Sequence, residues 1–565
     1  MNQTRFLLVF AWLMVATLLW MEWGKEQAAP RPVAPAAAAS IPAGLATAVP
    51  EAPAASATVP ASGPGAPAAS AATPAGAARA VTVTTDVLRV TLTGGELQRA
   101  ELLRYPSGKS DRTPVQLLSP QPALYFVAQT GWVGANGAAA PTHTGAFQPL
   151  VTGSELRIPE GARELVVPFE WRGPNGVVVR REYVFPRVGY TVQVRDRVSN
   201  AGAAAWQGFV YRQLARVPRE LASKGPMSAE QYSFQGAAWY TPEDKYNRCA
   251  YEDFGDDCAL RGTVQGGWIA MLQHHFFAAW IPPRQAANEF SLATAPGPGG
   301  AQHYLIRAVS PAFTVAPGQS VTTEARLWVG PKLVNQIEAQ DVPGLNRAVD
   351  FSRFDTMATL AGWLFWVLDR LHGLFGNWGW AIVGLVVLIR IAMFPLAQAQ
   401  YRSMAKMRKF QPRIEQLKER YGDDRQKFQM AMMELYKKEK INPVGGCLPI
   451  LIQMPVFLAL YWMLSESVEL RHAPWMGWIQ DLTARDPYFV LPLINIALMW
   501  ATQKLTPMTG MDPMQQKMLQ LMPIIFGVMF AFFPAGLVLY WVTNSALGLA
   551  QQYWMTRKYA ADAKS

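Results

Sequence analysis

Hydrophobic positions at the start of the chain form one nearly unbroken block and then give way to small residues. After Arg5, residues 6–23 are almost entirely apolar, which predicts a transmembrane signal anchor over residues 1–24 with its N-terminus in the cytoplasm. A signal peptide that is cleaved after this run is the alternative, because its short basic start is the same. Residues 25–78 consist largely of Ala, Pro, Ser, Gly and Thr, a composition that cannot bury a core and that predicts a flexible tether.

From about Val81 onward, apolar and polar residues alternate in short runs. The run from Tyr190 to Val198 is typical, and similar runs continue to about Val329, separated by Gly, Pro and Asn. A period of two fits strands with one buried face. Many such strands without helices between them favour two packed sheets. We therefore predict an all-β sandwich over residues 79–340.

Residues 345–376 follow a different period. Apolar side chains recur there at helical spacing with few charges between them, at Phe351, Phe354, Met357, Leu360, Leu364, Val367 and Leu371. This spacing predicts an amphipathic helix, which we expect to lie in the membrane interface. A helix packed on the β-domain would show the same pattern and is the alternative.

Apolar stretches close the chain, and each approaches the length of about 20 residues that a helix needs to cross a bilayer. They are residues 378–397, 447–465, 488–504, 518–533 and 536–555. The first belongs to a second transmembrane helix over residues 377–398, and the others form further transmembrane helices over residues 445–556. Together with the N-terminal anchor they predict roughly six spans of bilayer length. The expected fold is a multi-pass α-helical membrane protein that carries an all-β domain.

Charge fixes the expected orientation of these helices. The net charge is +11, and much of the basic excess lies in residues 399–444 and in the tail 557–565. By the positive-inside rule both segments are cytoplasmic, so both termini lie inside and the β-domain lies outside. Gly422-Asp423 predicts a break between two charged helices, and hence a cytoplasmic helical hairpin over residues 399–444. This basic surface would meet lipids, ribosomes and cytoplasmic chains, and no nucleic-acid motif accompanies it.

No catalytic signature accompanies this organisation. The sequence lacks a phosphate loop, a His-Glu-x-x-His motif and a Gly-x-Ser-x-Gly motif, so we expect no enzyme activity, no metal and no cofactor. His274 and His275 are neighbours in a strand-like run, which would point their side chains to opposite faces. Cys249 and Cys258 are close in sequence and are expected to form a disulfide if their domain is outside the cytoplasm. Two free thiols are the alternative.

The most unusual residue is Arg390, a charge inside an apolar stretch. It precedes Ala397, where the stretch ends, by seven residues, which places it about 10 Å inside the cytoplasmic end of a helix. An unpaired charge is costly there. Because no other apolar stretch offers a carboxylate on its inner side, we expect Arg390 to face water. Snorkelling of its side chain to the inner headgroups is the alternative.

Amide side chains add to this polar set. Gln453, Gln503, Gln520 and Asn544 lie in four different apolar stretches, mostly in the cytoplasmic half, and Gln551 follows Asn544 on the same helix face. With the arginine they predict a hydrophilic substrate-binding groove that is open to the cytoplasm and closed outward. Any one of these amides alone is better explained as a hydrogen-bonding contact between helices.

A set of motifs covers nearly all of residues 345–556. They are Arg390, Pro395, Gln400-Tyr401, Ser403-Met-Ala-Lys-Met-Arg408, Gln411-Pro412, Asn442-Pro-x-Gly-Gly-Cys-x-Pro449, Gln453-Met-Pro455, Asp512-Pro-Met-Gln-Gln-Lys517, Met522-Pro523 and Phe533-Pro-x-Gly-Leu-Val-Leu-Tyr540. In these motifs the sequence resembles the YidC membrane protein insertases. The N-terminal anchor, the tether and the outer β-domain are similar to the Gram-negative form of that family.

The resemblance implies a protein that inserts inner-membrane proteins and helps them to fold, alone or beside the Sec translocon, without ATP or a cofactor. The partners it implies are nascent membrane proteins, the Sec translocon and membrane lipids, with the ribosome added through the basic hairpin and tail. It implies that Arg390 is the groove arginine and that Tyr540 and Trp541 are the groove aromatics. Family members carry a second tyrosine where this chain has Trp541, and some carry a threonine where it has Val386. In the family, the large periplasmic β-sandwich has no established enzymatic role.

A multi-pass transporter or channel is the alternative function. Transporters usually show internal repeats and a midplane site that both sides of the membrane can reach. This sequence shows no repeat, and its polar residues gather toward one side. The pattern therefore favours the insertase interpretation, in which a one-sided groove receives part of another protein chain.

Overall fold

A computed structural model describes residues 79–562, with gaps at residues 109–110, 145–146, 220–232, 256–257, 259, 298–299, 353, 423, 439–447 and 506–512. The anchor and the tether predicted for residues 1–78 lie outside the described residues. The described chain forms two compact units. The first, called the β-unit here, runs to Asp350 and also contains Glu466–Glu469. The second, called the helical unit, holds the other residues from Phe351 onward.

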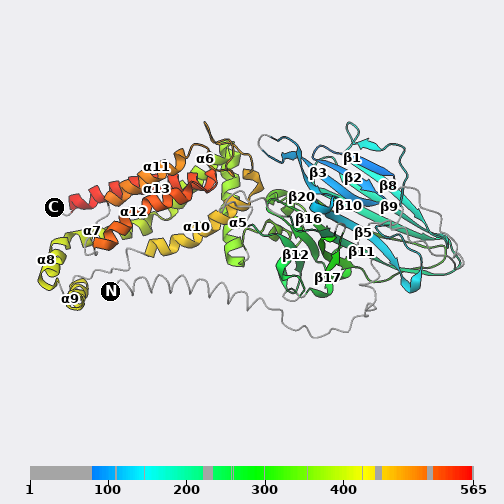
Figure 1. Ribbon diagram of the computed structural model, residues 1–565, viewed down its shortest axis with the longest axis horizontal. Coiled ribbons are helices and arrows are strands. Elements are labelled where there is room, and N and C mark those ends of the chain that lie inside the picture. Colours follow the sequence, from blue (N-terminus) through cyan, green and yellow to red (C-terminus); the bar gives the residue numbers. More distant parts are fainter. Residues whose placement is uncertain are drawn as a thin grey trace, which may run out of the picture. The chain divides into compact units, whose positions relative to one another are not determined.

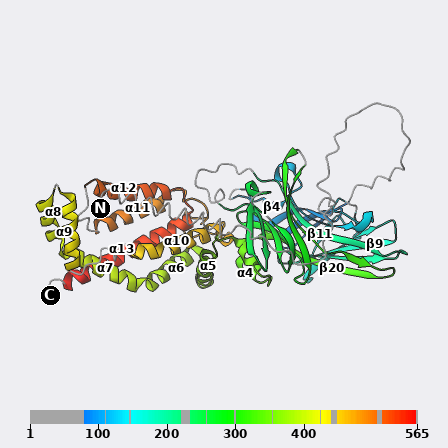
Figure 2. The same cartoon turned by 90° about the horizontal axis from the view of Figure 1, so that it is seen from below.

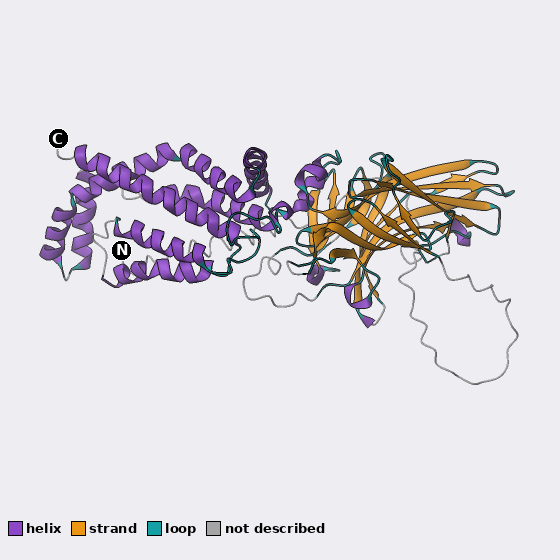
Figure 3. Ribbon diagram, turned by 90° about the horizontal axis from the view of Figure 1, so that it is seen from above, coloured by secondary structure: helices purple, strands orange, loops and turns teal. Residues whose placement is uncertain are grey.

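Two large sheets make up the β-unit, drawn as orange arrows in Figure 3. In its described part, the eleven-stranded sheet runs β14 (Arg261–Gln265), β17 (Ala287–Pro296), β18 (Gln302–Val309), β11 (Trp206–Arg216), β5 (Phe126–Gly134), β3 (Glu96–Pro106), β2 (Leu88–Thr93), β1 (Ala80–Thr84) and β7 (Glu155–Arg157), with β19 (Phe313–Val315) on β11 and β4 (Pro114–Leu118) on β3. The nine-stranded sheet runs β13 (Lys245–Ala250), β12 (Gly236–Thr241), β15 (Trp268–Leu272), β16 (Phe276–Ile281), β20 (Ser320–Pro331), β10 (Thr191–Asn200), β9 (Val177–Pro186), β8 (Glu164–Arg172) and β6 (Gln148–Pro149). The strands pair antiparallel, apart from the parallel pair β1 and β7.

Alternation along β10 shows how the sequence builds this sandwich. Val192, Val194 and Val198 are buried, whereas Arg195 and Arg197 on the other side of the strand are exposed. The strand pairs with β9 on one side and with β20 on the other, so its buried valines face the second sheet from a central position. The prediction of an all-β sandwich is confirmed.

A buried ion pair lies where the two sheets face each other. Arg181 of β9 donates a hydrogen bond from Nη2 to Asp196 Oδ2 of β10 over 2.7 Å. Trp132 of β5, in the other sheet, donates from its indole nitrogen to the same oxygen over 2.8 Å. Both charged side chains are almost fully buried, and removing one partner of such a pair typically costs about 3–5 kcal/mol. The network therefore joins the two sheets through one carboxylate.

Short helices follow the last strand of the β-unit. They are α4 (Val334–Glu338) and the 3-10 helix η5 (Leu345–Val349), and further 3-10 turns are η1 (Pro122–Leu124), η2 (Ala135–Gly137), η3 (Tyr251–Asp253) and η7 (Val468–Leu470). Glu466 Oε2 lies 3.7 Å from Nζ of Lys332, and both side chains are buried. Glu469 Oε1 accepts a hydrogen bond from the backbone N–H of Val334 over 3.1 Å. These contacts make the four residues from Glu466 part of the β-unit.

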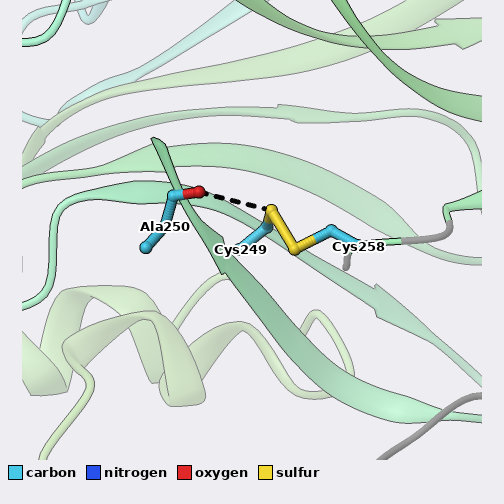
Figure 4. Close-up of a disulfide and its surroundings, with 3 residues drawn as sticks. All are labelled: Cys249, Ala250 and Cys258. Atoms are coloured by element: carbon cyan, nitrogen blue, oxygen red, sulfur yellow. Dashed lines mark hydrogen bonds between the residues drawn. A yellow bond between two sulfur atoms is a disulfide. The ribbon is translucent and has the colours of Figure 1, made fainter. Parts of the chain in front are cut away.

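A disulfide joins Cys249, near the end of β13, to Cys258 (Figure 4). Cys249 is buried, and its sulfur lies 3.5 Å from the carbonyl oxygen of Ala250. The bond closes the short segment between β13 and β14, which includes η3. It ties an irregular loop to the edge of the nine-stranded sheet.

The prediction for His274 and His275 was wrong. The two residues form a bend between β15 and β16, and their rings stack with centroids 3.7 Å apart. The rule that neighbouring side chains point to opposite faces holds within a strand, and these residues lie outside one.

The helical unit contains the longer helices of the described chain, and α6, α11 and α13 lie side by side in it (Figures 1 and 2). The helices are α5 (Asp355–Phe375), α6 (Trp378–Ala392), α7 (Phe394–Lys409), α8 (Gln411–Tyr421), α9 (Arg425–Lys438), α10 (Leu448–Glu466), α11 (Val490–Lys504), α12 (Pro513–Phe530) and α13 (Ala535–Asp562). Among the described residues, no helix alone has the length and apolar character to cross a membrane, whereas Trp378–Ala392 and Phe394–Tyr401, bent by 59°, together do. The expected number of transmembrane helices stays a prediction.

The helix α5 has two distinct faces. Ala361, Phe365 and Leu368 are buried, and the ring of Phe365 stacks at 6.4 Å on Trp378 of α6. On the other face, Trp363 and Trp366 are largely exposed. This division matches the amphipathic helix predicted for residues 345–376, although the observed helix begins at Asp355.

The first arm of the predicted cytoplasmic hairpin is two helices rather than one. The helix α7 ends at Lys409, and α8 begins after Phe410. Pro412 in the first turn of α8 explains the break, because proline has no N–H for the carbonyl of Arg408 and its ring clashes with that carbonyl.

The second arm starts with a different cap from the one predicted. Asp424 Oδ1 accepts hydrogen bonds from the backbone N–H groups of Gln426 and Lys427 at 3.2 and 3.1 Å. Asp424 therefore caps α9, and Asp423, the predicted cap, lies outside the described residues. The helices α8 and α9 pack side by side (Figure 2).

Candidate functional site

The helix α6 carries Arg390 in its last turn. Asn377 caps the start of the helix, since its side-chain oxygen accepts a hydrogen bond from the backbone N–H of Trp380 over 3.1 Å. The apolar residues that follow bury one face of the helix, including Ile382 and Val386. Arg390 comes four residues after Val386, so it continues this buried face toward the end of the helix.

The guanidinium of Arg390 binds α13. Its Nε donates a hydrogen bond to Asn544 Oδ1 over 2.8 Å, and its Nη2 donates to the main-chain carbonyl oxygen of Asn544 over 2.6 Å. Its Nη1 lies 3.4 Å from Gln551 Oε1. Gln453 of α10 reaches the same group, with its amide nitrogen 3.5 Å from Asn544 Oδ1. We call Arg390, Gln453, Asn544 and Gln551 the Arg390 cluster.

Within the part of the chain that the structure describes, Arg390 has no carboxylate partner, and its hydrogen bonds go to neutral groups. The contacts come from two side-chain amides and one main-chain carbonyl. Neutral acceptors orient a guanidinium without cancelling its charge. The cluster therefore presents a net positive charge, half-buried between α6 and α13.

Gly548 lies directly beside the guanidinium. A Cβ atom placed on this glycine would approach Arg390 Nη2 to 2.8 Å, which is closer than real Cβ contacts allow. Gly548 was not among the residues predicted for the groove, although its position four residues after Asn544 was the available signal.

The other two predicted groove amides do not reach Arg390. Gln503 of α11 donates from its amide nitrogen to the main-chain carbonyl of Leu519 on α12. It thus connects two helices, which is the alternative role that we expected for any one of these amides alone. Gln520 is exposed on α12, and no hydrogen bond among the described residues joins it to the Arg390 cluster.

Tyr540 and Trp541 stand one turn before Asn544 on α13, among aromatic rings. Tyr540 is buried, and its ring stacks on Phe457 with centroids 6.4 Å apart. Trp541 contacts Phe457 at 5.0 Å and Phe530 at 5.1 Å. The indole nitrogen of Trp541 has no acceptor among the described residues. The two rings, with Phe457 and Phe530, form an aromatic wall beside the Arg390 cluster.

The described part of the chain contains no group of three or more His, Cys, Asp and Glu side chains that is arranged to hold a metal ion. The groups gathered at the site are amides, a guanidinium and aromatic rings. Amides and a guanidinium bind and orient a polar partner through hydrogen bonds.

Two family models match the chain. The one described as 60Kd inner membrane protein covers residues 370–562, and the one described as YidC periplasmic domain covers residues 80–367. A relative from Stenotrophomonas maltophilia (strain R551-3), named membrane protein insertase YidC, is 56% identical over 568 residues, which cover 100% of this chain and 98% of the relative. A relative of the same name from Xanthomonas campestris pv. campestris (strain B100) is 55% identical over 572 residues, which cover 99% of this chain and 98% of the relative.

Solved structures show weaker similarity. An active YidC insertase crystal structure with the first transmembrane domain resolved is 18% identical, covers 85% of this chain and 94% of its own, and has a TM-score of 0.37. A galactose mutarotase related enzyme from Lactobacillus acidophilus is 10% identical, covers 44% of this chain and 97% of its own, and has a TM-score of 0.29.

Proposed function

Because the chain belongs to the YidC family of membrane protein insertases, we propose that it inserts inner-membrane proteins and helps them to fold, with the Arg390 cluster as the wall of a hydrophilic groove. The observation that carries this proposal is the full-length identity to relatives that are named insertases. The site adds a positive charge held by neutral groups alone within the described residues. Both features fit a protein that receives chains and does not transform them.

The groove acts by reducing the cost of moving a polar segment out of water. A hydrophilic tail that enters the apolar part of a bilayer loses its hydrogen bonds to water, which costs several kcal/mol per unsatisfied group, as a rule about 2–7. Amides such as Gln453 and Asn544 replace some of those bonds. The charge of Arg390 attracts acidic residues, and this attraction is stronger away from bulk water. The neighbouring apolar segment of the client then slides into lipid.

The family models support an inner-membrane protein with a periplasmic domain. We further propose that the chain crosses the membrane with roughly six helices of bilayer length, keeps both termini in the cytoplasm and opens its groove inward. The supporting observation is the basic excess of residues 399–444 and of the tail, which the positive-inside rule assigns to the cytoplasm.

Nascent membrane proteins are the clients that this function requires. We propose three further partners, namely the ribosome, the Sec translocon and anionic lipids. The ribosome would contact the basic hairpin formed by α8 and α9 and the tail, where lysine and arginine predominate. The Sec translocon would act beside the helical unit for larger clients. Anionic lipids would meet the same basic surface on the cytoplasmic side.

The transporter or channel considered as an alternative is not supported, because the relatives that match the full chain are named insertases. We also propose that the protein is not an enzyme and needs no cofactor. The supporting observation is the chemistry of the site, where the described residues offer hydrogen-bond donors and acceptors and no activated nucleophile.

Depletion in cells tests the proposed function. A strain whose own insertase is depleted would carry this chain on a plasmid, and insertion of a small two-span client would be followed by protease protection. We expect insertion to fail with an empty plasmid and to recover with the chain. Normal insertion in the fully depleted strain, or no recovery with the well-expressed chain, would contradict the proposal.

A further inference from the structure

The guanidinium of Arg390 has two edges that bind oxygen atoms, and the structure uses them differently. One edge is formed by Nε and Nη2, and the other by Nη1 and Nη2. Asn544 occupies the first edge completely, because its side-chain oxygen binds Nε at 2.8 Å and its main-chain oxygen binds Nη2 at 2.6 Å. Each contact has the length of a good charge-assisted hydrogen bond.

Asn544 can bind the Nε/Nη2 edge through both of its oxygen atoms because residue 548 is a glycine. In an α-helix, the carbonyl of a residue lies beside the side chain four positions later, which normally shields it. Gly548 is four residues after Asn544, and a Cβ there would come within 2.8 Å of Arg390 Nη2. The absence of a side chain at Gly548 therefore exposes the carbonyl of Asn544 to the guanidinium.

The second edge meets only a weak partner. Gln551 Oε1 lies 3.4 Å from Nη1, which is longer than a normal hydrogen bond of this type. The amide nitrogen of Gln551 is buried and has no acceptor among the described residues. A carboxylate at this edge would accept hydrogen bonds from the terminal nitrogens of Arg390 and also from the unpaired amide nitrogen of Gln551.

From this geometry we infer that Asn544 and Gly548 form a seat that positions Arg390, so that its Nη1/Nη2 edge, with Gln551, receives a carboxylate of the client chain. This inference rests on the proposed function, in which Arg390 attracts acidic client residues, and adds the residues that position Arg390 and the edge that stays available. Asn544 and Gly548 are positioning residues, because they act through Arg390. Gln551 sets specificity, because its free donor faces the same carboxylate.

Insertion of two matched clients tests the seat. Both are single-span proteins with an exported N-terminal tail, and they differ only in two tail residues, which are Asp in one and Asn in the other. The full-length chain and its variants complement the depleted strain, and immunoblots establish equal amounts in the membrane. The measured quantity is the fraction of each tail that becomes protease-accessible outside.

We expect Asn544→Ala and Gly548→Ala to lower insertion of the Asp tail about tenfold, as loss of one charge-assisted hydrogen bond implies, and to change the Asn tail less than about twofold. Gln551→Glu should do the same, since its carboxylate would occupy the client's edge while the seat stays intact. Ser545→Ala is the control on the same helix, because its hydroxyl donates to Asn495 instead. Gly362→Ala is the control for glycine replacement, as a Cβ there meets nothing within 4 Å.

The outcomes separate the seat from the groove itself. Equal loss for both tails would assign Asn544 and Gly548 a merely structural role and would overturn the inference. The ratio of Asp-tail insertion to Asn-tail insertion could also stay unchanged in Asn544→Ala, Gly548→Ala and Gln551→Glu but change in Arg390→Ala. That result would overturn the inference and leave the proposed groove in place. Unchanged insertion of both tails in Arg390→Ala would contradict the proposed groove.

Discussion

Arg390 Nε and Asn544 Oδ1 lie 2.8 Å apart and join α6 to α13 by a charge-assisted hydrogen bond. The acceptor is an amide, so the bond orients the guanidinium and leaves its charge uncompensated. A carboxylate in the same place would have formed an internal ion pair. With an amide as its partner, the charge of Arg390 stays available for the client carboxylate proposed above.

Because the carboxyl of Glu96 is buried, we expect the stability of the β-unit to depend on pH. Burial raises its pKa to about 7 from an ordinary value of 4.5, although a hydrogen bond from Gln98 acts in the opposite direction. Between these values the folded chain binds more protons than the unfolded chain, so stability falls as the pH rises from about 4.5 to about 7 and is then constant. The full change is about 3 kcal/mol.

Hydrogen exchange of β3 and β5 amides in the full-length chain measures this effect, after correction for intrinsic rates. Glu96→Gln should remove most of the pH dependence, because glutamine does not titrate. Glu101→Gln, on the same strand and paired with Arg89 and Arg99, is the matched control and should keep it. Protection in Glu96→Gln that still falls with rising pH would show that another group is responsible.

The buried pair of Lys332 and Glu466 predicts a non-additive response to substitution. Their charged atoms lie 3.7 Å apart, and the hydroxyl of Ser233 also donates to Glu466 over 3.1 Å. Lys332→Met alone leaves a buried carboxylate without its cation and should destabilise the β-unit by about 3–5 kcal/mol. The double substitution with Glu466→Leu should recover most of that loss. Pulse proteolysis of the full-length chain in urea gives the free energies, and additive losses would argue against a coupled pair.

The disulfide of Cys249 and Cys258 predicts a redox-dependent stability. It closes a loop with a sequence separation of nine, and constraining the unfolded chain in this way contributes about 3 kcal/mol. Reduction, or replacement of both cysteines by serine, should lower the thermal midpoint of the β-unit in the full-length chain. Cys447→Ser serves as the control. An unchanged midpoint after complete reduction would mean that the loop is held by other contacts.

Insertion is expected not to depend on most of the β-unit, and deletion of residues 79–320 tests this. The Arg390 cluster lies entirely in the helical unit. Residues 321–350 are kept because they include Lys332, without which Glu466 would lose its cation. We expect growth of the depleted strain to be largely restored by this deletion variant. Loss of viability with a well-expressed variant would move essential work to the β-unit.

Local patterns in the sequence predict the strands of the β-unit, but they do not predict which strands pair with one another. The alternation of Val192, Val194 and Val198 identifies a half-buried strand, which the structure shows as β10. Its pairing with β20, where Val194 faces Ala325, joins residues far apart in the chain. Such pairings depend on how all strands share two sheets, and no short window of sequence contains that information.

At the site, too, the sequence predicts which residues are polar but not which neighbours they contact. Polar residues in apolar stretches pointed to Arg390 and Asn544, and a spacing of seven residues placed Gln551 on the face of Asn544. The structure brings these three together. Gln503 followed the same pattern and instead links α11 to α12, because a sequence shows that an amide is in an apolar helix but not which neighbour it faces. Gly548 was missed because a glycine in such a helix usually serves close packing.

The most direct test of the account is insertion of the two-span client in depleted cells that carry Arg390 variants. Arg390→Ala should lower insertion about tenfold or more, as loss of a charge-assisted interaction implies. Arg390→Lys should retain part of the activity, because lysine keeps the charge and loses the planar fork. Arg370→Ala, an exposed arginine of α5, is the control and should insert normally. Wild-type insertion with well-expressed Arg390→Ala would contradict the proposal that this charge acts on the client.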